Sequence, residues 1–125
     1  MNKKILVVDD DNDIIEPLEL ILESKGYKVL SITKGKLVSS SIASFKPDLI
    51  LLDILMSGSD GREICKTLKK DKKTLDIIII MMSAHPTAQK DSLEAGANDF
   101  IAKPFETTEL MLLLEKYLSK PKKSS

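Results

Sequence analysis

The sequence predicts a single α/β domain built on a five-stranded parallel sheet with helices on both faces. Five short apolar runs alternate with five segments in which apolar residues recur at helical spacing, which is the pattern of repeated strand–helix units. The run Leu-Ile-Leu-Leu at residues 49–52 shows no polar alternation, as in strands covered on both faces. A chain of 125 residues suits one domain with a core of its own.

The five expected strands are short and rich in β-branched or other aliphatic residues. They cover residues 4–8, 27–32, 49–53, 76–82 and 99–102. The second alternates partly between polar and apolar residues, which suggests an edge position. Since every crossover between parallel strands is expected to be right-handed, the carboxyl ends of all five strands should meet at one edge of the sheet.

Helix signals follow each strand. The first helix is expected to start near Asp13, capped by Asn12 or Asp13, to be distorted locally at Pro17 and to end at Gly26. The second and last helices are marked by apolar stripes, and Asp60 can cap the third. These apolar positions are Leu37, Val38, Ile42 and Phe45 in the second helix, Ile64, Cys65 and Leu68 in the third, and Leu110, Leu113, Leu114, Tyr117 and Leu118 in the last.

The fourth helix has the least apolar mass. Pro86 suits its first turn and Gly96 closes it. Leu93 is its only large aliphatic residue, helped by Ala88 and Ala95. Because little burial gives weak anchoring, this helix is expected to be mobile.

The composition narrows the class of protein. Nineteen basic and nineteen acidic residues cancel, so charge gives no argument for nucleic acid or an anionic membrane as the main partner. One cysteine, Cys65, excludes an internal disulfide and a cysteine metal cluster, and it is expected to be buried. With no signal peptide and no apolar run near the ~20 residues that span a bilayer, a cytoplasmic protein is expected.

Chemically active residues follow four of the five strands. Asp9 and Asp10 follow the first strand, Asp53 ends the third, Ser83 follows the fourth and Lys103 follows the fifth. Two carboxylates at ~5 Å repel by roughly 3 kcal/mol at an effective dielectric near 20, so the three acids need a cation or a proton. Oxygen ligands with room for water suit Mg²⁺, and hydroxyl and ammonium groups can bind phosphate oxygens. The set predicts a phosphoryl-transfer site with an aspartate nucleophile.

The chain resembles the response-regulator receiver domains of two-component signalling. The resemblance covers residues 3–120 and rests on four motifs at strand ends: Ile-Leu-Val-Val-Asp-Asp-Asp (5–11), Pro-Asp-Leu-Ile-Leu-Leu-Asp (47–53), Ser-Ala (83–84) and Phe-Ile-Ala-Lys-Pro-Phe (100–105). It implies a flavodoxin-like (βα)5 fold with strand order 2-1-3-4-5. The expected domain is 1–120, followed by a short basic tail, 121–125.

The resemblance also implies the role of each site residue. Asp53 would accept a phosphoryl group from a histidine kinase or a histidine phosphotransfer protein. Asp9, Asp10, Asp53 and the Leu55 backbone carbonyl would hold Mg²⁺, for which Mn²⁺ could substitute. Ser83 and Lys103 would contact the phosphoryl oxygens. Phe100 would be the aromatic switch residue, the bond to Pro104 would be cis, and Leu55 and His85 would be candidates for modulating dephosphorylation.

Phosphorylation adds charge and acceptors at Asp53, which would draw Ser83 inward and let Phe100 fill the vacated space. The surface of the fourth helix, fifth strand and last helix would then change and control an unidentified protein partner. Ser57 departs from the pattern, since such loops usually carry proline there, so the loop is expected to be less rigid. Phe100 replaces the frequent tyrosine, and plain core packing is its alternative role.

Such a domain would catalyse only its own phosphorylation and dephosphorylation, as a monomer or a weak phosphorylation-dependent dimer. Two other functions are compatible with parts of this pattern. A phosphorylation-independent pseudo-receiver has the same fold, but here all reactive positions are filled. A phosphatase of the haloacid-dehalogenase type also uses an aspartate, Mg²⁺, a hydroxyl and a lysine, but its nucleophile follows the first strand, whereas the isolated acid here, Asp53, follows the third.

Overall fold

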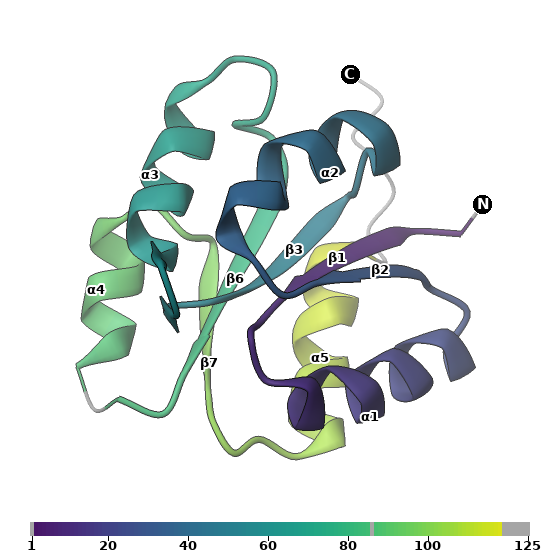
Figure 1. Cartoon of the computed structure of the whole chain (residues 1–125). Helices are drawn as coiled ribbons and strands as arrows, with labels where there is room; N and C mark the ends of the chain where they lie inside the picture. The colour runs from purple at the N-terminus through teal and green to yellow at the C-terminus, as the bar shows by residue number, and fades with distance from the viewer. Residues whose placement is uncertain (1, 86, 119–125) are drawn as a thin grey trace.

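The computed structural model describes residues 2–85 and 87–118, which form a parallel sheet between two layers of helices (Figure 1). All neighbouring strands in this sheet pair in parallel, in the order β2-β1-β3-β6-β7. These strands are β1 (Lys4–Val8), β2 (Lys28–Ile32), β3 (Leu49–Asp53), β6 (Ile78–Ser83) and β7 (Asp99–Ala102). The predicted order 2-1-3-4-5 is confirmed, because β6 and β7 are the fourth and fifth strands of this sheet, and β2 lies at its edge.

Two further strands form a small separate hairpin in the segment around Ser57 that was expected to be a loop. β4 (Leu55–Met56) pairs antiparallel with β5 (Ser59–Asp60) directly after β3. Strands of two residues are too short to carry a periodic pattern, so the hairpin leaves no strand signal in the sequence.

The helices divide into two layers, one on each face of the sheet (Figure 1). On one face lie α1 (Asn12–Ser24) and α5 (Thr107–Leu118), and their apolar sides share a core with residues of β1, β3, β6 and β7. The second core lies on the opposite face under α2 (Val38–Phe45), α3 (Gly61–Lys70) and α4 (Ala88–Glu94), and a 3₁₀ turn, η1 (Gly35–Leu37), precedes α2. The central strand β3 is buried along its whole length, as its unbroken apolar run predicts.

The helix limits differ in detail from those expected. Asp11 caps α1, accepting the N–H of Asp13 at 2.9 Å, so the choice of Asn12 or Asp13 as the cap is wrong by one or two residues. The helix continues through Pro17 in its second turn, and Gly26 follows its end with a φ of +93°. At α3 the predicted cap is confirmed, because the Asp60 carboxylate accepts the Arg62 N–H at 2.9 Å.

The anchoring residues of α4 agree with the expected set for Ala88 and Ala95 but not for Leu93. Ala88, Ser92 and Ala95 are buried, whereas Leu93 is 55% exposed. The side chain of Leu93 therefore points away from the core, and the apolar contacts of the helix come from small residues. Pro86, expected in the first turn, lies outside the described residues.

The remaining core agrees with the apolar pattern. Cys65 is buried as expected, and the α5 stripe buries Leu110, Leu114 and Leu118, with Leu113 and Tyr117 packed beside them. Within residues 2–85 and 87–118, no helix combines the length and apolar character needed to cross a membrane. The expected basic tail, 121–125, lies outside the described residues.

Candidate functional site

Three carboxylates converge at the edge of the sheet where its strands end. Asp9 follows β1 and Asp53 is the last residue of β3, and these strands are neighbours. One oxygen each of Asp9, Asp10 and Asp53 lies within 4.8 Å of the other two. Asp9 and Asp53 are buried, at 0% and 6% exposure, whereas Asp10 is open to solvent. The cluster can therefore be reached by an ion from the Asp10 side.

Lys103, directly after β7, brings the opposing charge. Its Nζ donates a hydrogen bond to Asp9 Oδ2 at 2.6 Å and lies 3.4 Å from Asp53 Oδ1. The lysine side chain is 16% exposed, so its ammonium is largely removed from water at the contact. Three carboxylates and one ammonium leave a formal charge of −2, which a divalent cation would neutralise.

The electrostatics of the site act most strongly on Asp53. Burial, the nearby charge of Asp9 and a smaller effect of Asp10 raise the pKa of Asp53 to about 6, although Lys103 opposes the shift. Burial by itself would lower the pKa of Lys103, but the hydrogen bond to Asp9 and the charges of Asp53 and Asp9 outweigh burial and raise it. The lysine therefore stays an ammonium, while the Asp53 carboxyl exchanges its proton near pH 6.

Ser83 is the last residue of β6 and is buried beside the acids' edge of the sheet, with 5% exposure. Its Oγ accepts the N–H of His85 at 3.0 Å, which leaves the hydroxyl hydrogen for another acceptor. The His85 ring is exposed and turns to the start of α4, where its Nδ1 lies 3.0 Å from Thr87 Oγ1.

The other residues implied by the resemblance lie around this group. Phe100, on β7 opposite Met81, is half-buried and packs against the core under α2, α3 and α4. Leu55 is 59% exposed and begins β4, two residues after Asp53. The Lys103–Pro104 peptide bond is cis.

Gly61, which the sequence analysis did not single out, fixes the segment that leaves Asp53. Its N–H donates to Ile54 O at 2.7 Å, and a Cβ at this position would overlap the backbone carbonyl oxygen of Asp53. The start of α3 can therefore approach the end of β3 only because residue 61 has no side chain. The sequence signal was the glycine directly after a helix cap.

Replacing Gly61 with alanine is expected to lower the free energy of unfolding by about 2–4 kcal/mol, because backbone must move to admit the methyl group. Urea unfolding measures this change. Gly26→Ala is the contrasting variant: nothing lies within 4 Å of a Cβ there, so only its positive φ opposes the change and about 1 kcal/mol is expected. Equal losses in both variants would contradict the close-approach explanation.

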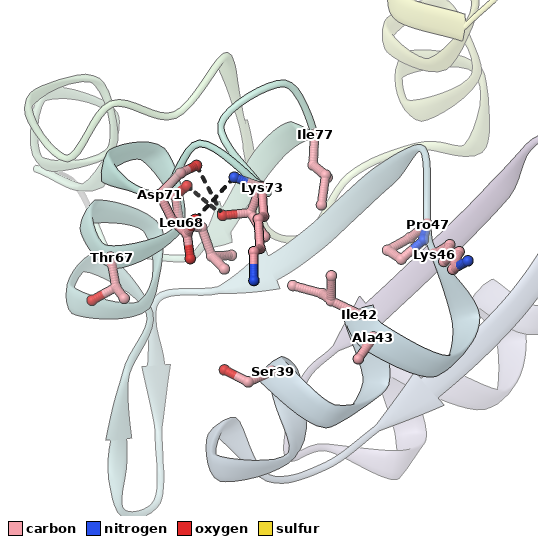
Figure 2. Close-up of a pocket in the computed structure, with 11 residues that line it drawn as sticks. Ser39, Ile42, Ala43, Lys46, Pro47, Thr67, Leu68, Asp71, Lys73 and Ile77 are labelled. Atoms are coloured by element: carbon pink, nitrogen blue, oxygen red, sulfur yellow. Dashed lines mark hydrogen bonds between the residues drawn. The ribbon is translucent and has the colours of Figure 1, made fainter.

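A second concave region lies on the same face of the sheet as α2 and α3, and Asp9, Asp10 and Asp53 do not line it. It is a cavity of about 520 Å³ between these helices (Figure 2). The hydroxyls of Thr67 and Thr74 in its wall already donate to backbone carbonyls, of Glu63 and Leu68. The remaining lining is Ser39, Ile42, Ala43, Lys46, Pro47, Leu68, Asp71, Lys73 and Ile77. The cavity is therefore separate from the candidate site.

Comparison with known proteins agrees with this geometry. The family model for the response regulator receiver domain matches residues 5–115. The chain belongs to this family. Receiver domains are signalling domains rather than classical enzymes, and the haloacid-dehalogenase alternative is thereby overturned.

Both a curated relative and a solved structure show how much of the chain the similarity covers. The phosphate regulon transcriptional regulatory protein PhoB of Pseudomonas aeruginosa is 40% identical over 120 residues, covering 94% of this chain and 52% of PhoB. The chain thus spans about half the length of such curated relatives. A response regulator structure from Chloroflexus aurantiacus has a TM-score of 0.90 at 34% identity, covering 96% of this chain and all of that one.

A further solved relative was determined with a metal ion bound. The receiver domain of a sensor histidine kinase from Pseudomonas aeruginosa has a TM-score of 0.85 at 28% identity, covering 96% of this chain and all of that one. It was solved with a magnesium ion coordinated in its active site cleft.

Proposed function

We propose that this receiver domain accepts a phosphoryl group on Asp53 and uses it to change a protein-binding surface. The observation that carries the proposal is the convergence of Asp53 with Asp9, Asp10 and Lys103 at the end of the central strands, with oxygens within 4.8 Å and the ammonium at 2.6 and 3.4 Å. A histidine kinase or a histidine phosphotransfer protein would be the donor, in the cytoplasm.

The acids fit a hard divalent cation, Mg²⁺ by preference and Mn²⁺ as a substitute. They offer only oxygen ligands, they carry an excess of two negative charges over Lys103, and Asp10 leaves an open side for water and phosphate. Asp9, Asp10, Asp53 and the Leu55 carbonyl would hold the ion. When bound, it neutralises charge that develops on the phosphoryl oxygens.

In the proposed transfer, an Asp53 oxygen forms a bond to phosphorus while the bond from phosphorus to the donor's imidazole nitrogen breaks. Asp53 must be ionised to attack, and the site must neutralise the added phosphoryl charge. The Lys103 ammonium, 3.4 Å from Asp53 Oδ1, is placed to pair with a phosphoryl oxygen, and the Ser83 hydroxyl is free to donate to another.

The output would be a rearrangement of α4, β7 and α5. Movement of Ser83 toward the phosphoryl group would open space beside β7 for Phe100, which is only half-buried in this structure. The buried residues of α4 and its C-cap are the small ones Ala88, Ser92 and Ala95, so little apolar burial opposes displacement of the helix. An as yet unidentified protein would recognise the changed surface, which we call the α4–β7–α5 face.

Beryllofluoride tests this proposal because it binds a carboxylate in the shape of a phosphoryl group. With Mg²⁺ present, amide NMR resonances of Asp53, Ser83 and Lys103 are expected to shift, together with those of the α4–β7–α5 face. Asp53→Asn is expected to abolish both sets of shifts.

Two outcomes would contradict the proposal. Shifts confined to the acids would remove the switching role. No response in a folded protein that binds Mg²⁺ would instead favour the phosphorylation-independent pseudo-receiver.

A further inference from the structure

Asp10 is held differently from the other two acids of the site. Asp9 is buried, pairs with Lys103 and also accepts the Asp11 N–H at 3.0 Å. Asp53 is buried and lies 3.4 Å from the Lys103 ammonium. Asp10 is exposed, and in the described part of the chain its carboxylate has one hydrogen bond, from the backbone N–H of Ser57 at 2.8 Å.

This contact joins two segments 47 residues apart in the chain. Ser57 lies in the turn of the β4–β5 hairpin, beside Gly58, whose φ of +76° lets the hairpin reverse. The base of the hairpin is closed by the Gly61 N–H, which donates to Ile54 O at 2.7 Å, directly after the end of β3. The donor at residue 57 is thus presented to Asp10 by a braced turn rather than by a free loop.

Because the three carboxylates repel one another, the Ser57 N–H can affect the position of Asp10. Asp9 and Asp53 cannot move far because they are buried, so the like charge of the cluster drives the exposed acid, Asp10, toward solvent. A hydrogen bond to a charged oxygen opposes that displacement more strongly than one to a neutral acceptor. Asp10 also borders an open cleft of about 520 Å³ that contains Ser57 and Lys34, so it has room to swing away if released.

We propose that the Ser57 N–H is a positioning group that keeps the Asp10 carboxylate turned toward Asp9 and Asp53 and thereby raises the affinity for Mg²⁺. The inference rests on the proposed function of the acids. The inference also explains what is gained by having serine at residue 57, where such loops usually carry proline. A proline has no N–H to donate to Asp10, whereas serine has one.

Calorimetric titration with MgCl₂ tests the affinity. Ser57→Pro is expected to bind Mg²⁺ about 3- to 10-fold more weakly than the unaltered protein, the scale of one lost hydrogen bond to a charged group that is partly replaced by water. Ser57→Ala is the matched control: it keeps the N–H and should bind within about twofold of the unaltered protein.

The two ideas fail in distinguishable ways. If the unaltered protein does not bind Mg²⁺, the metal part of the proposed function falls, and this inference falls with it. If the unaltered protein binds and Ser57→Pro binds equally well or more tightly, only the positioning role is overturned. A weakened Ser57→Ala would likewise overturn it, because the hydroxyl rather than the N–H would be responsible.

Amide hydrogen exchange provides a test that does not depend on the folding of Ser57→Pro. In the unaltered protein, the Ser57 N–H is expected to be protected, to stay protected when Mg²⁺ is added, and to lose protection in Asp10→Ala. Loss of protection on adding Mg²⁺ would mean that the ion displaces the donor, and the positioning role would be refuted.

Discussion

Replacing Asp53 with asparagine is expected to stabilise the metal-free protein at pH 7.5 by about 3 kcal/mol. Burial and Asp9 raise the pKa of Asp53 from 3.8 to about 6, and each pKa unit corresponds to ~1.4 kcal/mol. Above that pH the fold must hold a charged carboxylate beside Asp9 and Asp10. The amide removes this cost, so the Asp53 carboxylate is destabilising when no cation is bound.

The direction of the Asp53 pKa shift determines how the free energy of unfolding depends on pH. Since the folded state binds the Asp53 proton more tightly than the unfolded state, this group's contribution is fully present below pH ~4 and is lost as the pH rises through ~6. The gain from Asp53→Asn should therefore be large at pH 7.5 and small at pH 4.

Urea unfolding in EDTA, with both proteins at both pH values, measures this difference. Glu16→Gln, which neutralises an exposed carboxylate on α1, is the control and should change stability by less than about 0.5 kcal/mol. Added Mg²⁺ should reverse the order of the two proteins, because the ion stabilises the one with three acids more. An Asp53→Asn protein less stable than the unaltered one at pH 7.5 in EDTA would contradict this electrostatic explanation.

Lys103→Met is expected to destabilise the metal-free protein by about 2–3 kcal/mol. The substitution removes the ammonium 2.6 Å from Asp9, a carboxylate with no exposed surface, and leaves its charge unpaired. Uptake of a proton by Asp53, whose pKa is raised to about 6, limits the loss, so the destabilisation should be smaller at pH 5 than at pH 7.5. Mg²⁺ should restore part of the stability by supplying the missing positive charge.

The same unfolding measurement on Lys116→Met provides the comparison. That lysine pairs with Asp99 at 3.6 Å but is 60% exposed, so losing it should cost less than about 1 kcal/mol. Equal effects of the two substitutions would show that burial does not set the value of the Lys103 contact.

Much of the fold could be predicted from local sequence because buried strands appear in the sequence as apolar runs. The run at 49–52 identified the central strand, and the topology of parallel strands then placed Asp9, Asp53 and Lys103 at one edge. Their convergence needed no knowledge of distances, only the rule that strand ends meet.

Features set by tertiary contact could not be predicted. Leu93 was expected to anchor α4. A single aliphatic residue does not indicate which side of a helix faces the core, and in the structure Leu93 is exposed. The β4–β5 hairpin is too short for a pattern, and the contact from Ser57 to Asp10 depends on how that hairpin folds back. The raised pKa of Asp53 likewise follows from burial that only the folded chain creates.

The most direct test of the central proposal is the intact mass of the protein after incubation with acetyl phosphate and Mg²⁺. A single phosphoryl adduct that hydroxylamine removes is expected, and it should be absent from Asp53→Asn and from a sample in EDTA. An adduct that persists in Asp53→Asn, or no adduct on folded, Mg²⁺-bound protein from either acetyl phosphate or a phosphohistidine donor, would contradict Asp53 as the phosphoryl acceptor.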